Sequence, residues 1–132
     1  MLKSVISYQG NCDEAINYYK EVLGAEVKEI AYFRDAPPDS GMEDMGLPPN
    51  FVMHSEVGIY GTTIVMTDGA EKPFSGISML LAFDTAEEVT AVFNKLAKGG
   101  TIVSELAPQF WASLNGTVND PFGIEWTVLT NN

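Results

Sequence analysis

The chain carries its clearest structural signal in two stretches, NCDEAINYYKEVLG at residues 11–24 and TAEEVTAVFNKLAKGG at residues 85–100. In the first stretch, apolar side chains recur at the spacing of one helical face, at Ala15, Tyr18, Tyr19, Val22 and Leu23. Asn11 is suited to cap this helix, with Glu14 three residues later as in a capping box, and Gly24 is suited to end it. The first stretch therefore predicts an amphipathic helix.

The second stretch repeats this pattern at a constant offset of 74 residues. Its cap is Thr85, its box acid is Glu88, and Gly99 and Gly100 end it. Its apolar face consists of Val89, Val92, Phe93, Leu96 and Ala97. Because the caps, the acids and the apolar positions match at one offset, we interpret the chain as an internal duplication.

Segments with strand character flank the two predicted helices in the same order. They are residues 2–8, 25–33, 51–60 and 62–67 in the first half, and 76–83, 101–106, 110–118 and 123–129 in the second. The turn Asp-Pro-Phe-Gly at residues 120–123 joins the last two. Each half therefore has the order βαβββ. We predict a single α+β domain, residues 1–132, with two tandem modules at about 1–67 and 76–130.

Composition narrows the function classes. The chain has 132 residues and a net charge of -11, so the phosphate backbone of a nucleic acid would be repelled. The longest apolar run, at residues 79–83, is far too short to span a membrane. The single cysteine, Cys12, cannot form an internal disulfide, and the N-terminus shows no signal-peptide pattern. We therefore expect a cytoplasmic protein without nucleic-acid or membrane partners.

Two groups of ionisable side chains could carry chemistry. His54 is the only histidine, and on an alternating strand it shares a face with Glu56, whereas the other face has Met53, Val57 and Ile59. A histidine near a carboxylate can act as a general base or bind a ligand, and a structural histidine is the alternative. Glu125 is either a cavity carboxylate or a solvated strand residue.

Three further features have alternative interpretations. Cys12 falls in the first turn of a helix, where the dipole can lower a thiol pKa, but no base is identifiable beside it, so we expect an inert or mildly reactive thiol. Phe110 and Trp111 form either an aromatic wall for a planar ligand or part of the core. Residues 34–50 hold four of the seven prolines and form a lid, a dimer element or a mobile loop.

The order and spacing of four motifs resemble the PhnB-like branch of the glyoxalase, bleomycin-resistance and extradiol dioxygenase (vicinal oxygen chelate) superfamily. The motifs are QGNCDEA at 9–15, VMHSE at 52–56, Phe110-Trp111 and DPFGIEW at 120–126. The resemblance covers nearly the whole chain. It implies that each module curls its mixed sheet around a cavity, with the helix outside and the ligand inside.

The resemblance also bears on metal binding. The metal enzymes of the superfamily place one His or Glu ligand on each of four strands, and the matching positions here are Ser4, Val65, Ser78 and Thr127. None of these side chains supplies an imidazole, carboxylate or thiolate group. We therefore expect no cofactor, with a divalent metal ion held in a non-standard way as the open alternative.

The leading interpretation is a metal-independent protein that binds a small planar or amphipathic molecule. The resemblance places the pocket at Ser4, Ile6, Tyr8, Thr63, Val65, Ser78, Leu80, Trp111 and Thr127. The alternative is an enzyme with lyase, isomerase or dioxygenase-like activity that uses His54 with Glu56 or Glu125, with or without a divalent metal. The resemblance further implies a symmetric homodimer.

Overall fold

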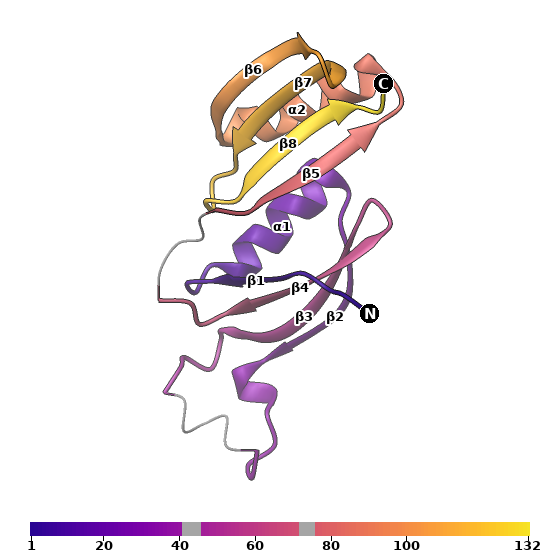
Figure 1. The fold of residues 1–132 in the computed structure, drawn as a ribbon. Coiled ribbons are helices and arrows are strands. Elements are labelled where there is room, and N and C mark those ends of the chain that lie inside the picture. Colours follow the sequence, from indigo (N-terminus) through magenta and orange to yellow (C-terminus); the bar gives the residue numbers. More distant parts are fainter. Residues whose placement is uncertain (41–45, 72–75) are drawn as a thin grey trace. The chain divides into compact units, whose positions relative to one another are not determined.

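The computed structural model describes residues 1–40, 46–71 and 76–132, and it divides into two units, Met1–Pro73 and Phe74–Asn132. The first unit contains β1 (Val5–Tyr8), α1 (Cys12–Leu23), β2 (Glu26–Tyr32), the short 3₁₀ helix η1 (Phe33–Asp35), β3 (Val52–Ile59) and β4 (Thr62–Asp68). The second contains β5 (Ser78–Phe83), α2 (Ala86–Gly99), β6 (Thr101–Gln109), β7 (Ala112–Asn119) and β8 (Glu125–Thr130) (Figure 1).

Both units build a four-stranded mixed sheet with the same topology. The strand orders are β1-β4-β3-β2 and β5-β8-β7-β6. In each sheet the first pair is parallel and the other two pairs are antiparallel. The predicted α+β fold with two tandem βαβββ modules is therefore confirmed.

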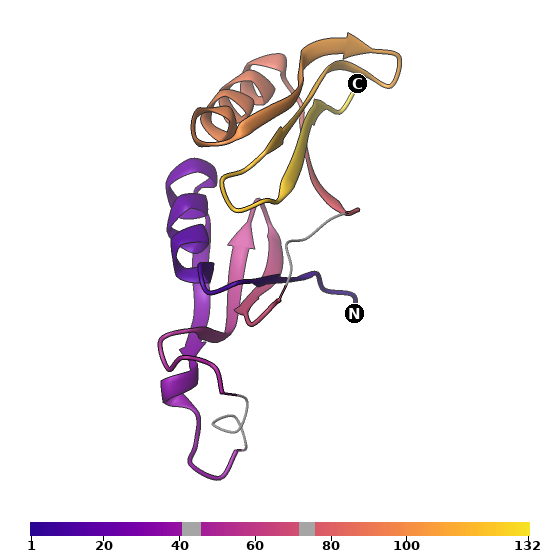
Figure 2. The ribbon, with the colours of Figure 1, turned by 90° about the vertical axis from the view of Figure 1, so that its left-hand side faces the viewer.

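The helix of each unit covers one face of its own sheet (Figure 2). The predicted apolar stripes form this contact, since Ala15 and Tyr19 of α1 are fully buried, as are Val89 and, to within 2%, Phe93 of α2. Beneath the helices lie Ile6, Val57, Ile64 and Met66 in the first unit and Leu81, Val118, Trp126 and Val128 in the second. The opposite face of each sheet is left uncovered by the helix of its own unit.

The two helices begin in different ways. The hydroxyl of Thr85 accepts a hydrogen bond from the Glu88 amide at 3.2 Å, so the predicted cap of α2 is confirmed. Asn11 makes no side-chain cap bond to α1. The carboxylate of Asp68, at the end of β4, accepts from the Cys12 amide at 3.0 Å instead. The predicted capping box at Asn11 is wrong because a residue distant in sequence supplies the acceptor.

A bulge changes the alternation at the start of β3. The register with β2 shifts between Ala31 and Tyr32. As a result Val52 is fully buried, whereas Met53 is only half-buried. Val52 therefore takes the place in the core that the simple alternation predicted for Met53.

The two ends of the predicted loop at residues 34–50 are joined by backbone hydrogen bonds. The Arg34 amide donates to the Pro49 carbonyl at 3.0 Å, and the Phe33 amide donates to the Phe51 carbonyl at the same distance. Residues 41–45 of this predicted loop lie outside the described residues. In the part of the chain that is described, no helix is long and apolar enough to cross a membrane.

Candidate functional site

The uncovered face of the first sheet gathers ionisable side chains from three strands. A row of directly paired residues crosses the sheet, in the order Val5, Val65, Glu56 and Glu29. Ser55 and Val57, the neighbours of Glu56 along β3, are fully buried on the helix side. Because successive strand residues point to opposite faces, Glu56 and His54 share the uncovered face.

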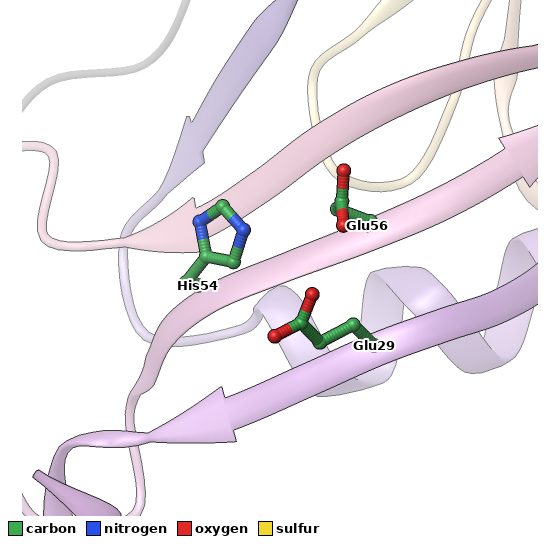
Figure 3. Close-up of side chains that lie close together, drawn as sticks. All are labelled: Glu29, His54 and Glu56. Atoms are coloured by element: carbon green, nitrogen blue, oxygen red, sulfur yellow. The ribbon is translucent and has the colours of Figure 1, made fainter.

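Glu29, His54 and Glu56 form a compact group on this face. One potential ligand atom from each of the three side chains lies within 4.8 Å of the others. Figure 3 shows the side chains pointing toward one another from the neighbouring strands β2 and β3. Alternation along one strand predicted that His54 and Glu56 lie together, but it did not predict Glu29. Only the register, in which Glu29 lies opposite Glu56, brings this residue into the group.

A lysine from the N-terminal segment completes the charge pattern. The Nζ of Lys3 donates to Oε1 of Glu56 at 3.2 Å. The pKa of Glu56 is lowered, first by this hydrogen bond and then by a hydrogen bond with Glu29 and the charge of Lys3. Glu56 is therefore an ionised carboxylate at neutral pH, held in a partly exposed setting between one cation and one further acid.

Hydroxyl groups and a second lysine extend the polar surface. Nζ of Lys28 donates to Oγ1 of Thr63 at 2.7 Å. Thr67 and Ser7 form a hydrogen bond of 3.3 Å between their hydroxyls across β4 and β1. The uncovered face thus offers donors and acceptors on all four strands of the first sheet.

A hollow of about 340 Å³ lies beside this face, at the end of α1 and the β3–β4 turn. It is lined by Leu23, Gly24, Glu26, Lys28, Gly58, Tyr60 and Gly61. Lys28 connects the hollow to the uncovered face through its bond to Thr63. None of the residues predicted for the pocket lines this hollow, and no periodic pattern in the sequence indicated it.

The predicted pocket residues of the first unit do not share one face of the sheet. Thr63 and Val65 lie half-buried on the uncovered face. Ile6 and Tyr8 are each 3% exposed and face α1, where the Tyr8 hydroxyl is 2.8 Å from that of Tyr19. They belong to the core and we leave them out of the proposed site. Ser4 is exposed and precedes β1.

The predicted residues of the second unit lie on the uncovered face of the second sheet. Leu80 is 57% exposed and pairs with Thr127, and Ser78 pairs with Glu125. The hydroxyl of Thr127 is 3.3 Å from that of Thr117. Glu125 is half-buried on β8, in the other unit from His54 and Glu56.

Phe110 and Trp111 form an exposed aromatic pair at the tip of the β6–β7 hairpin. Their rings pack edge to face with 4.7 Å between the ring centroids, and Phe110 is 96% exposed and Trp111 53% exposed. Nε1 of Trp111 donates to Oδ1 of Asn115 at 3.3 Å. Of the two interpretations, packing in the core of their own unit is contradicted by this exposure.

The four positions that match the superfamily's metal ligands do not fit a divalent ion. Val65 has no donor atom, and the hydroxyls of Ser4, Ser78 and Thr127 are poor donors for such ions. The strand register also shows that Ser4 and Ser78 are not equivalent positions of the two units. Val5 pairs with Val65, whereas Leu80 pairs with Thr127, so equivalent residues of β1 and β5 are 75 positions apart rather than 74.

Cys12 is fully buried at the start of α1. Burial raises the pKa of its thiol well above the usual range, and the negative charges of Asp68 and Asp13 raise it further. The helix dipole does not lower this pKa, because desolvation and two carboxylates outweigh it. The thiol is therefore protonated and unsuited to act as a nucleophile.

Comparisons with known proteins agree with this architecture. The protein YjdN of Escherichia coli is 32% identical over 139 residues, which cover 96% of this chain and 92% of YjdN. The crystal structure of PA1353 from Pseudomonas aeruginosa has a TM-score of 0.82 at 28% identity, with 98% of each chain covered.

A more distant structure shares the fold alone. The fosfomycin resistance protein FosX of Listeria monocytogenes has a TM-score of 0.70 at 11% identity, with 98% of this chain and 91% of FosX covered. The profile of the Glyoxalase/Bleomycin resistance protein/Dioxygenase superfamily matches residues 2–128. The predicted superfamily is confirmed, and the chain belongs to the Glyoxalase/Bleomycin resistance protein/Dioxygenase superfamily.

Proposed function

We propose that the protein binds a small amphipathic molecule on the uncovered face of its first sheet, and that this binding needs no metal at the four positions where superfamily enzymes hold one. The observation that carries the proposal is the group of Glu29, His54 and Glu56 on a face that its own helix leaves open. Superfamily membership supports the small-molecule class of ligand.

The chemistry of the face suggests which groups the ligand carries. Val5 is 55% exposed and lies next to half-buried Val65, so the middle of the face offers apolar area. Around it, the side chains of Lys3, His54 and Glu56 offer both donors and acceptors. Such a mixture favours a molecule with an apolar body and at least one polar group, because apolar contact supplies area and the few polar groups fix orientation.

A ligand screen tests this proposal directly. We would measure thermal stability of the EDTA-treated protein in the presence of a library of amphipathic metabolite-sized molecules. A ligand present at 100 times its Kd stabilises the folded state by about 2.7 kcal/mol, which a thermal shift detects. The wild-type protein should respond to at least one compound, and His54→Ala and Glu56→Gln should respond less.

Thr117→Val provides the matched control, because Thr117 occupies the position in the second sheet that Glu56 occupies in the first. This variant should respond to the same compounds as the wild type. A response that His54→Ala and Glu56→Gln leave unchanged would contradict the proposed site.

A second candidate function is acid–base catalysis by the same side chains. It is favoured by the position of His54 between two carboxylates, one of which is held ionised by Lys3. Carboxylates of this kind can orient an imidazole by accepting a hydrogen bond from its ring N–H. If the wild type converts a bound compound and His54→Ala still binds the compound but no longer converts it, this activity is established. If the wild type binds the compound without converting it, the activity is excluded for that compound.

We further propose a cytoplasmic homodimer. The buried, unpaired Cys12 suits a reducing compartment.

Among the residues that the structure describes, the outer strands β2 and β6 each pair with one neighbour only, and on β6 Ile102 and Val103 are 39% and 53% exposed. Unpaired edges of this kind favour association of two copies. Light scattering should give twice the chain mass of 14.4 kDa. A mass of one chain at every concentration would contradict the dimer.

A further inference from the structure

The group formed by Glu29, His54 and Glu56 has a composition that suits a metal ion as well as an organic ligand. Imidazole nitrogen and carboxylate oxygen are the donors that Zn²⁺ and related divalent transition metals use in proteins. None of the three residues occupies a position that matches the superfamily's metal ligands, which fall just before β1 and on β4, β5 and β8. The group lies instead on β2 and β3.

We propose that Glu29, His54 and Glu56 bind a divalent transition-metal ion such as Zn²⁺ on the uncovered face of the first sheet. The ligand set would be one imidazole nitrogen and two carboxylate oxygens. With three protein ligands, a fourth position stays open to water or to a bound molecule, as in catalytic rather than structural zinc sites.

The geometry requires only small side-chain adjustments. In a tetrahedral site, donor atoms about 2.0–2.2 Å from one ion lie roughly 3.3–3.6 Å from one another. The three donor atoms here lie within 4.8 Å of one another, so side-chain rotations must bring them about an ångström closer together. Glu29 and His54 are exposed and Glu56 is partly exposed, which leaves their terminal torsions free to close this difference. The backbone that carries them is fixed by the antiparallel pairing of Glu29 with Glu56 and of Ala31 with His54.

The charges around the group also favour a cation. Glu29 and Glu56 place two carboxyl groups on directly opposed positions, where like charges destabilise a sheet unless a cation lies between them. Lys3 supplies part of that compensation through its 3.2 Å contact with Glu56. A metal ion would compensate both carboxylates at once. Lys3 is therefore a competitor for the site, and its removal should strengthen metal binding.

Calorimetric titration of Zn²⁺ into tag-free, EDTA-treated protein tests the proposal. We expect one saturable site per chain with a Kd on the order of micromolar. Since His54 is the only histidine, its ring proton signals report the site without ambiguity, and they should shift as the site fills. This experiment uses no organic ligand, so its failure would not contradict the proposed small-molecule function. Likewise, the ligand screen uses EDTA-treated protein, so failure of that screen would not contradict the metal site.

Variants separate a built site from diffuse attraction to an acidic protein. Glu29→Gln, His54→Ala and Glu56→Gln should each weaken Zn²⁺ binding by about tenfold or more, since even outer-shell changes cost this much. Lys3→Met should tighten it several-fold. Glu26→Gln removes a charge from the same strand outside the group and should leave affinity within about twofold.

Circular dichroism of each variant checks that the fold is kept, which the exposure of these side chains favours. Absence of saturable binding at millimolar Zn²⁺ would overturn the proposal. Equal weakening by Glu26→Gln and Glu29→Gln would also overturn it, because it would assign the binding to net charge alone.

Discussion

In the first sheet, the row of directly paired residues across the four strands reads Val5, Val65, Glu56 and Glu29. The matching row of the second sheet reads Leu80, Thr127, Thr117 and Ser104. The strand order and the helix position are the same in both units, so the duplicated backbone does not by itself create the charged group. The two units differ at two positions of this row. The first unit has carboxyl groups there, at Glu56 and Glu29, whereas the second unit has hydroxyl groups, at Thr117 and Ser104.

The two units also differ at the neighbouring position on the same face of β3 and β7. His54 is exposed in the first unit, whereas its counterpart in the second unit, Asn115, is 9% exposed and accepts a hydrogen bond from Trp111. An accessible imidazole in one unit therefore corresponds to a covered amide in the other. The first unit therefore presents accessible ionisable groups at these positions, and the second unit has a more closed polar contact.

The helix beginnings differ as well. The first helix depends on Asp68, which accepts hydrogen bonds from the amides of Gly10, Cys12 and Val52 at 2.8–3.0 Å. The second depends on Thr85, which is adjacent in sequence to the helix that it caps. A single carboxylate thus ties together the end of β1, the start of α1 and the start of β3, whereas the cap of α2 is local.

The largest expected effect in this comparison concerns these two caps. Asp68→Ala should lower the free energy of unfolding by about 3 kcal/mol or more, because three amides in partly or fully buried positions lose their acceptor and each such loss costs about 1–3 kcal/mol. Thr85→Ala should cost only about 1 kcal/mol, as is typical of an exposed cap. Urea denaturation monitored by circular dichroism measures both values.

Asn11→Ala is the matched control for the first helix, because Asn11 makes no cap bond, and its cost should stay within about 0.5 kcal/mol. If Asp68→Ala costs no more than Thr85→Ala, the tertiary cap does not stabilise the first unit as we describe.

An intermediate effect is expected at a core position where the units differ. Gly116 in β7 corresponds to Ser55 in β3, whose hydroxyl donates to the Met66 carbonyl at 2.7 Å. A Cβ at Gly116 would lie 2.6 Å from Cε2 of Phe93 and 2.9 Å from Leu106. Gly116→Ser should therefore destabilise the protein by about 1–3 kcal/mol through overpacking. An unchanged midpoint in urea would show that Phe93 has room to move and that the two cores are more alike than their side chains indicate.

The smallest expected effect is a pH dependence found in the first unit. The hydroxyl of Tyr32 donates to Oδ1 of Asp13 at 2.9 Å, and this hydrogen bond, followed by burial, raises the pKa of Tyr32 above its usual value of 10.0. Because the folded-state pKa is raised, the contribution to stability is complete below the unfolded pKa and is lost as pH rises through the folded value.

Tyr32→Phe should therefore be less stable than the wild type at pH 8, and the difference should shrink above about pH 10, where the wild type loses this contribution. Thermal denaturation of both proteins at pH 8 and pH 11 provides the measurement. A difference that stays constant over this range would mean that the hydrogen bond does not discriminate between the two protonation states.

Much of the fold was predictable from local patterns, and the errors have physical causes. The apolar stripes at 3.6-residue spacing predicted both helices, and the repeat predicted the duplication, because burial of one helical face depends only on neighbouring residues. The cap at Asp68 and the 75-residue offset of the first strands depend on contacts between distant segments. Sequence spacing alone does not report such contacts.

The candidate site was predictable only in part for the same reason. Alternation along one strand placed His54 and Glu56 on one face, yet the bulge near Met53 made Val52 the core residue at that end. Glu29 joins the group through a register that no local pattern encodes. Ile6 and Tyr8 entered the predicted pocket because the resemblance placed a cavity without stating which face of β1 the helix covers.

Heteronuclear NMR mapping of a small-molecule ligand tests the central claim of this account, that the first unit carries the binding face. We would titrate a compound that stabilises the EDTA-treated protein into ¹⁵N-labelled protein and follow the backbone amides. We expect the largest shifts at Glu56, Gly58, Thr63 and Val65 on β3 and β4, together with changes in the His54 ring signals. Shifts confined to Leu80, Thr117 and Thr127 of the second unit, with His54 unaffected, would contradict the account.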